Sequence, residues 1–180
     1  ACVVSRINKI LLKNVNRAKI ISMKKFEIHM HSTFSDGEFS PTRLVDIARG
    51  NGVSVLCLTD HDTFEGIPEF MAAAKAEEIS AFPGIEITVR YRGFNLHLLA
   101  YFESIESLSD ELSHEVMKMA SKRERRMREL IYRVNEVIPE KFRGTIEYEN
   151  VRRAAEGVLA RPHLAKEMVR LGVVPSTRDA

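Results

Sequence analysis

The order of strand-like and helix-like segments most narrows what this chain of 180 residues can fold into. Short apolar segments typical of strands alternate with amphipathic segments typical of helices, in the order β-α-β-α-β-β. One apolar run, at residues 53–59, is continuous, which is typical of a strand covered on both faces. This order predicts an α/β layer or barrel with a largely parallel sheet. The predicted elements are Phe26–His31, a helix beginning at Ser40-Pro41, Val53–Thr59, Ile67–Glu78, Ile85–Val89 and Leu96–Tyr101.

Beyond Glu103 the sequence becomes polar and strongly helical. We interpret residues 23–103 as an α/β domain, residues 104–160 as a helical insertion into it, and residues 161–180 as the return of the chain to that domain. The predicted helical segments are residues 106–137, residues 145–160 and Pro162–Leu171.

A basic leader precedes the first predicted strand and accounts for the sign of the net charge. The whole chain has 27 Lys and Arg residues against 25 Asp and Glu residues, a formal net charge of +2. Without the basic residues of the leader, residues 23–180 carry a net charge of −3. We expect residues 1–22 not to belong to the fold, because a transit peptide, a cloning scar or translated upstream sequence would each explain them. The basic residues are Arg6, Lys9, Lys13, Arg17 and Lys19.

The composition excludes several classes of protein. Hydrophobic residues make up 44% of the chain, which excludes intrinsic disorder. No run of about 18 apolar residues exists, so we expect no membrane-spanning helix. The two cysteines, Cys2 and Cys57, are too few for a disulfide framework or a cysteine-rich zinc module. We interpret both as free thiols in a reducing cytoplasm, with Cys57 a small residue of the core.

The histidines carry the chemistry. His29 and His31 stand two residues apart on a predicted strand, so both side chains project from the same face and can chelate a divalent metal. Alone, such a pair is weak evidence, and an isolated histidine in an apolar strand is usually a core residue. The candidate ligands, however, all fall at the ends or inner faces of successive strands, which favours a metal site. They are His29, His31, Asp36, His61, Glu86 and His97.

Four segments in this order resemble the motifs of the PHP (polymerase and histidinol phosphatase) family. The segments Arg123–Arg126 and Arg161–Ala165 are similar to one branch of that family, small phosphoesterases acting on 3′,5′-nucleotide bisphosphates and on the 5′ ends of short RNA. The four motif segments are Phe26–Ser32 with Ser35–Gly37 and Pro41, Leu58–Thr63 with Gly66, Phe82–Ile87, and His97–Phe102.

The resemblance implies the N-terminal part of a distorted (β/α)7 TIM-like barrel with a helical insertion. It also implies two or three divalent metal ions, manganese by first expectation, with zinc or iron as alternatives. By motif position, His29 and His31 would hold one metal, Glu86 would bridge it to a second that His97 also binds, and Asp36 and His61 would hold a third.

The family pattern extends further than this sequence. Later strands typically add a His and then an Asp-x-His near the C-terminus, and no Asp-x-His follows the Arg-Pro-His segment here. A TIM-like barrel also needs about 200–250 residues. We therefore expect the chain to be truncated at its C-terminal side, with domain-swapped or oligomeric completion as the alternative.

The function that the resemblance implies is metal-dependent phosphoester hydrolysis. The substrate would be a phosphate monoester or 5′-terminal phosphodiester of a nucleotide, such as a 3′,5′-bisphosphate, or of a short RNA or DNA end. Metals would supply hydroxide from bound water, and Asp60 would orient His61 or nearby waters. Neither a membrane nor an obligate protein partner is indicated. The alternatives are a non-catalytic PHP-like module, an inactive fragment and a histidinol-phosphate phosphatase.

A basic stretch fits a phosphate-rich substrate. The helical segment at residues 118–133 carries seven basic residues and two acids, which ordinarily indicates a solvated face. Arg123, however, occupies the apolar stripe, where an arginine needs an anion, and Arg126 adjoins it. Both are candidate substrate-binding residues, and we expect Arg123→Ala to raise KM more than it disturbs the metals. Arg161 and His163 are further candidates beside a helix N-terminus, unless they merely start that helix.

Overall fold

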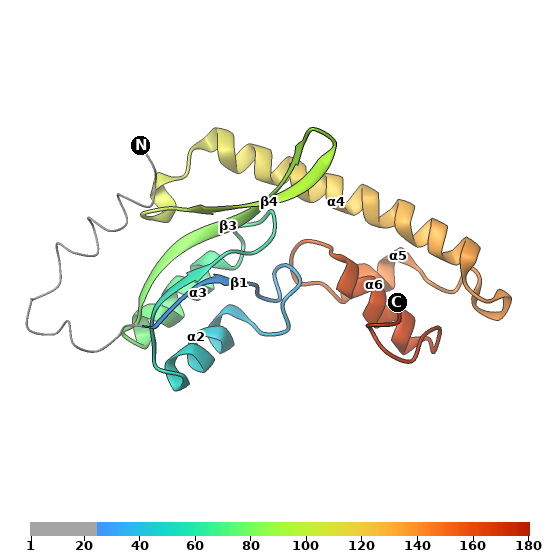
Figure 1. Cartoon of the computed structure of the whole chain (residues 1–180), viewed down its shortest axis with the longest axis horizontal. Helices are drawn as coiled ribbons and strands as arrows, with labels where there is room; N and C mark the ends of the chain where they lie inside the picture. The colour runs from blue at the N-terminus through green and yellow to red at the C-terminus, as the bar shows by residue number, and fades with distance from the viewer. Residues whose placement is uncertain (1–24) are drawn as a thin grey trace, which may run out of the picture.

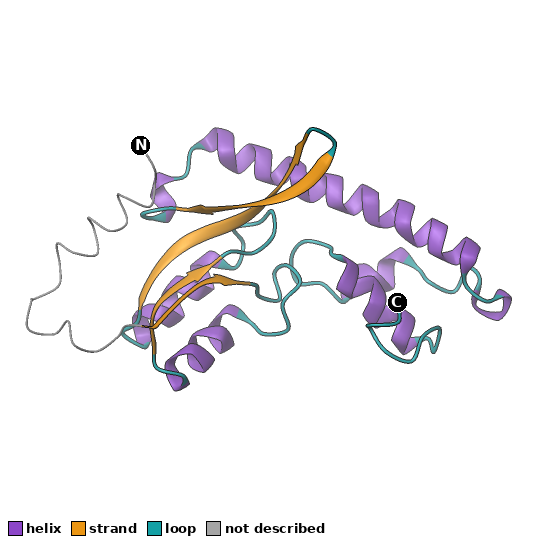
Figure 2. Ribbon diagram, viewed as in Figure 1, coloured by secondary structure: helices purple, strands orange, loops and turns teal. Residues whose placement is uncertain are grey.

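The computed structural model describes residues 25–180, so the expectations for the leader and for Cys2 lie outside it. Four strands form one sheet in the order β1-β2-β3-β4, which curls like part of a barrel wall (Figure 2). The first three strands run parallel and the fourth pairs antiparallel with the third, which confirms the predicted α/β fold. The strands are β1 (Lys25–Met30), β2 (Val53–Leu58), β3 (Ser80–Tyr91) and β4 (Phe94–Tyr101).

The strand β3 is longer than the sequence predicts, because it serves two neighbours. Its first residues, Ser80–Pro83, pair with β2, and its later residues, Gly84–Tyr91, pair with β4. Proline and glycine are poor strand residues, so the pattern predicts only the part after them. The double pairing brings one strand into contact with both halves of the sheet.

Two helices, α2 (Pro41–Gly50) and α3 (Ile67–Ala76), cover one face of the sheet (Figure 1). Ser40 caps α2 as expected, since its side chain accepts a hydrogen bond from the Arg43 backbone N–H. Cys57 is fully buried in β2, and burial raises the pKa of its thiol to about 12. The core under the helices consists of Met30, Val45, Ala48, Leu56, Leu58, Ile67, Phe70 and Ala74.

The second half of the described chain is helical and has a core of its own. The long helix α4 passes the β3–β4 hairpin and runs on toward α5 and α6 (Figure 1). None of the helices in residues 25–180 is both long and apolar enough to cross a membrane. The helices are α4 (Asp110–Val137), α5 (Tyr148–Arg153) and α6 (Arg161–Arg170), with single turns η2 (Ile105–Ser107) and η3 (Glu140–Phe142). Their shared core includes Met127, Ile131, Ile138, Ile146, Val151, Leu159, Leu164 and Met168.

The predicted helix over residues 145–160 is helical only in α5. Residues 154–160 instead lie against the turn that follows β1. The Val158 N–H donates to the Phe34 carbonyl at 2.9 Å, and Thr33 hydrogen-bonds the Glu156 side chain. Backbone groups that bond to this turn cannot also continue a helix, so the docking of this segment explains the shorter helix.

Gly157 is expected to be indispensable to this docking. A Cβ at this position would lie 2.1 Å from the Phe34 carbonyl oxygen, whereas a Cβ at Gly50 would meet nothing within 4 Å. We predict that Gly157→Ala lowers the free energy of unfolding by about 1–3 kcal/mol, because backbone on both sides must shift. Gly50→Ala, the control, should change it by less than about 1 kcal/mol. Urea unfolding of both variants checks this, and equal effects would contradict the docked arrangement.

Candidate metal centre

The candidate ligands lie around the carboxyl ends of β1 and β2 and on the adjoining strands β3 and β4. β1 carries His29 and leads into His31, while β3 and β4 carry Glu86 and His97. Pairing continues beyond the end of β2, since the Glu86 N–H donates to the Asp60 carbonyl at 3.1 Å and His61 forms an isolated bridge with Glu86. The backbone itself therefore brings residues from four strands or strand ends to one place.

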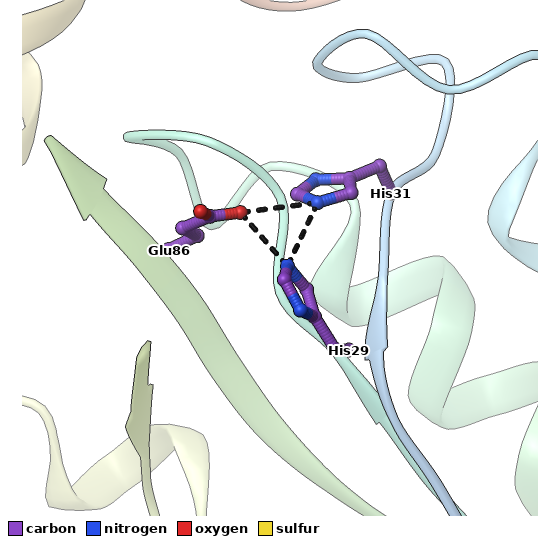
Figure 3. A group of neighbouring side chains, drawn as sticks. All are labelled: His29, His31 and Glu86. Atoms are coloured by element: carbon purple, nitrogen blue, oxygen red, sulfur yellow. Dashed lines mark hydrogen bonds and ion pairs between the residues drawn. The ribbon is translucent and has the colours of Figure 1, made fainter. Parts of the chain in front are cut away.

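Glu86 lies at the centre of the cluster. Its Oε2 atom is 3.0 Å from His29 Nε2 and 3.1 Å from His31 Nε2, and the two imidazole nitrogens are 3.1 Å apart (Figure 3). The same oxygen is 3.6 Å from His61 Nδ1, while Oε1 is 2.7 Å from His97 Nδ1. One carboxylate thus faces four imidazoles, an arrangement suited to a ligand that bridges two metal ions.

Asp36 extends the cluster on the side of His31 and His61. Its carboxylate oxygens lie 3.7 Å from His31 Nδ1 and 3.6 Å from His61 Nε2. Donor atoms within 4.8 Å of one another form three overlapping groups, and every predicted ligand belongs to at least one. The groups are His29–His31–Glu86, His31–Asp36–His61 and His61–Glu86–His97.

The donor set fits divalent metal ions. The Nδ1 atoms of His31 and His61 are buried and have no hydrogen-bond partner among residues 25–180, so both sit where a metal could take their lone pairs. Burial, the largest influence, lowers the pKa of His61 and keeps its imidazole in the neutral form that ligates metals. Imidazole and carboxylate donors together suit manganese, zinc or iron.

Charge also favours a bound cation at Glu86. Burial, the largest influence, by itself raises the pKa of this carboxyl, but hydrogen bonds with His29 and His97 act in the opposite direction and help to outweigh it. The net result is a pKa below the usual range for glutamate. Glu86 is therefore an anion at neutral pH, although only 5% of it is exposed.

Asp60 has a different neighbour from the one expected. Its carboxylate accepts hydrogen bonds from the Ser32 N–H and the Ser32 hydroxyl, each at 2.6 Å, and from the Ser35 hydroxyl. Both oxygens are thereby engaged by the turn between His31 and Asp36 rather than by His61. Sequence reasoning missed the two serines. They could have been found from the sequence, because a buried carboxylate such as that of Asp60 needs hydrogen-bond donors, and serine hydroxyls near the other ligands can supply them.

Arg123 is buried, and the anion that faces it is Asp62. Its Nε donates to Asp62 Oδ2 at 2.6 Å, and a terminal nitrogen donates to Thr88 Oγ1 at 3.0 Å. The sequence predicts an anion for Arg123 from its place on the apolar stripe but does not identify Asp62.

The other basic candidates divide into two kinds. Arg126 and Arg161 are exposed and line a pocket together with Asp36, His61 and His97. His163 is buried, and its Nδ1 accepts a hydrogen bond from the Ala160 N–H at 3.0 Å, which caps the start of α6. Burial lowers the pKa of His163 and keeps the imidazole neutral. The structure thus brings the two arginines to the cluster and gives His163 a capping contact.

Comparison with known proteins accords with this site. Residues 27–162 match the PHP domain. A 5′-3′ exoribonuclease of Haemophilus influenzae is 33% identical over 158 residues, covering 87% of this chain and 55% of the relative. A 3′,5′-nucleoside bisphosphate phosphatase of Chromobacterium violaceum is 35% identical over 77 residues, covering 43% of this chain and 27% of the relative.

A solved structure shares the fold. A protein of Bifidobacterium adolescentis, assigned as a metal-dependent phosphoesterase, superposes with a TM-score of 0.76 at 27% identity, over 88% of this chain and 54% of that one. The chain spans about half the length of the relatives that it matches along most of its own length. The family predicted from four motifs is confirmed, and the chain belongs to the PHP-domain family.

Proposed function

We propose that the protein containing this chain is a metal-dependent phosphoesterase acting on a nucleotide bisphosphate or the end of a short oligonucleotide. The observation that carries the proposal is the set of three donor groups, which overlap because His31, His61 and Glu86 each belong to two of them. This set lies next to a pocket lined by Arg126 and Arg161. A negatively charged substrate that ligates metals fits both features. The relatives named as a nuclease and a nucleotide phosphatase support the same class of substrate.

Each part of the site has a distinct task in this proposal. His29, His31, Asp36, His61, Glu86 and His97 would hold two or three divalent ions, with manganese the first expectation. Such ions, when bound, activate water and neutralise charge on a phosphate group. Arg126 and Arg161 would bind phosphate oxygens and orient the substrate in the pocket. Asp60 would hold the turn between His31 and Asp36 in place through Ser32 and Ser35.

Several predictions from the sequence remain predictions. The division into a domain at residues 23–103, an insertion at residues 104–160 and a return at residues 161–180 stays a prediction. So do the identity and number of the metals, the roles of individual site residues and the cytoplasmic location.

A phosphate-release assay tests the proposed activity on the full-length protein. We expect Mn²⁺ to stimulate release from a 3′,5′-nucleotide bisphosphate. His29→Ala, which removes a solvent-facing member of the cluster, should slow release by at least about 10-fold, since even a change to an outer partner of a ligand costs about 10- to 100-fold. His114→Ala, an exposed histidine on α4, is the matched control and should leave the rate unchanged. Equal rates for wild type and His29→Ala, or faster release from histidinol phosphate, would contradict the proposal.

A further inference from the structure

The residue directly after His61 has an unusual backbone. Asp62 has φ of 50°, in the left-handed region that residues with a side chain rarely adopt. Such a conformation persists only where surrounding contacts hold it, and it is common at functional sites. Whatever holds Asp62 therefore also fixes the backbone from which the His61 imidazole projects.

Three contacts hold Asp62, and one of them comes from a distant helix. The Asp62 N–H donates to the Glu86 carbonyl at 3.1 Å, and Asp62 Oδ1 accepts from the Thr88 N–H at 2.6 Å. Arg123 of α4 supplies the third contact, from its Nε to Asp62 Oδ2 at 2.6 Å. Since Arg123 also donates to Thr88 Oγ1, its guanidinium joins the loop after β2 to strand β3.

The position of Arg123 on its helix favours a fixed contact. The buried residues of α4 are Val116, Arg123, Met127 and Ile131, so the arginine lies on the apolar face of the helix. Arg123 is 9% exposed and Asp62 1% exposed. A buried charge that loses its partner is costly, which keeps the two side chains together. Arg126 lines the same pocket as Arg123 but is exposed.

We propose that Arg123 is a positioning residue, which through Asp62 holds His61 in the orientation where its nitrogens face Asp36 and Glu86. The inference rests on the proposed metal centre and assigns Arg123 a different role from direct phosphate binding. Without Arg123, the Asp62 carboxylate loses its cation and the left-handed turn loses one of its restraints. Metal binding that depends on His61 then weakens, while the His29–His31–Glu86 group, held by β1 and β3, persists.

A manganese titration of the full-length protein tests this role. Electron paramagnetic resonance counts free Mn²⁺ and so gives the affinity of each class of site. We expect Arg123→Ala and Asp62→Asn each to weaken one class by about 10- to 100-fold and leave a second class within about 2-fold. The double variant should be no weaker than the worse single variant, because both changes break one contact. Arg123→Lys should recover part of the affinity, since lysine keeps the charge but not the planar geometry.

Arg133→Ala, which removes an exposed arginine of the same helix outside the pocket that Arg123 lines, is the control and should bind Mn²⁺ like wild type. Circular dichroism verifies folding, and if Arg123→Ala does not fold, Asp62→Asn and Arg123→Lys carry the test. Manganese affinities unchanged in these variants would overturn the positioning role, as would a raised KM with unchanged metal binding. Absence of Mn²⁺ binding by wild type would instead refute the metal centre itself, so the two failures are distinguishable.

Discussion

Glu86→Gln is expected to abolish tight metal binding by the cluster. The two Glu86 oxygens together face His29, His31, His61 and His97, at distances between 2.7 and 3.6 Å. Glutamine keeps the size of the side chain but removes the negative charge and one acceptor oxygen. Among the described residues, Glu86 is the carboxylate that belongs to two of the donor groups, whereas Asp36 belongs to one. No second carboxylate is therefore placed to replace it.

We expect the Mn²⁺ affinity to fall by at least about 100-fold. Changing a residue that only hydrogen-bonds a metal ligand typically costs about 10- to 100-fold, and loss of a ligand itself should cost more. Isothermal titration calorimetry of the full-length protein measures it. Glu38→Gln is the matched control, since this exposed carboxylate lies in the turn near Asp36 but in none of the donor groups. Phosphate release should fall in parallel with metal occupancy. Retention of wild-type affinity by Glu86→Gln would show that Glu86 is not a ligand.

Removal of both pocket arginines is expected to impair substrate binding and spare the metals. Arg126 of α4 and Arg161 of α6 line the pocket beside His61 and His97. Hydrogen bonds to charged groups contribute about 1.5–3 kcal/mol each, which corresponds to about 10-fold or more in affinity. We therefore predict that the Arg126→Ala/Arg161→Ala variant raises KM for a nucleotide bisphosphate by about 100-fold.

Steady-state kinetics at saturating Mn²⁺ measures this effect, and metal titration of the same variant provides the internal control. Arg143→Ala, which removes an exposed arginine outside this pocket, should leave KM unchanged. The effect should also shrink at high salt, because exposed charges are screened. An unchanged KM in the double variant would place both guanidinium groups outside the substrate path.

The sequence predicts which candidate ligands come together because their positions follow from local rules. The alternation of side chains along a strand places His29 and His31 on one face, and parallel strands bring their carboxyl ends to one edge. Alternation along β3 likewise separates Glu86 from Ile85 and Ile87, whereas His97 lies on the antiparallel strand β4 and meets Glu86 through the pairing of β3 with β4. Each of these inferences needs only the period of a strand and the direction of its neighbour.

The contacts that the sequence does not predict join residues far apart in the chain. Arg123 lies 61 residues from Asp62, and nothing in the spacing of α4 identifies the loop that it meets. The place of Arg123 on the apolar stripe predicts an anion but leaves open whether a substrate or the protein supplies it. Gly157 likewise gives no local signal, because its lack of a side chain matters only against the Phe34 carbonyl.

Anomalous diffraction from crystals grown with Mn²⁺ tests the metal centre most directly. The arrangement of donors predicts at least two peaks at the manganese edge, one near His29 and His31 and another near His61, with Glu86 in contact with both. The same crystals of Glu86→Gln should lose or greatly weaken these peaks. Absence of anomalous density at the cluster in the wild-type protein, or peaks only at other residues, would contradict the account.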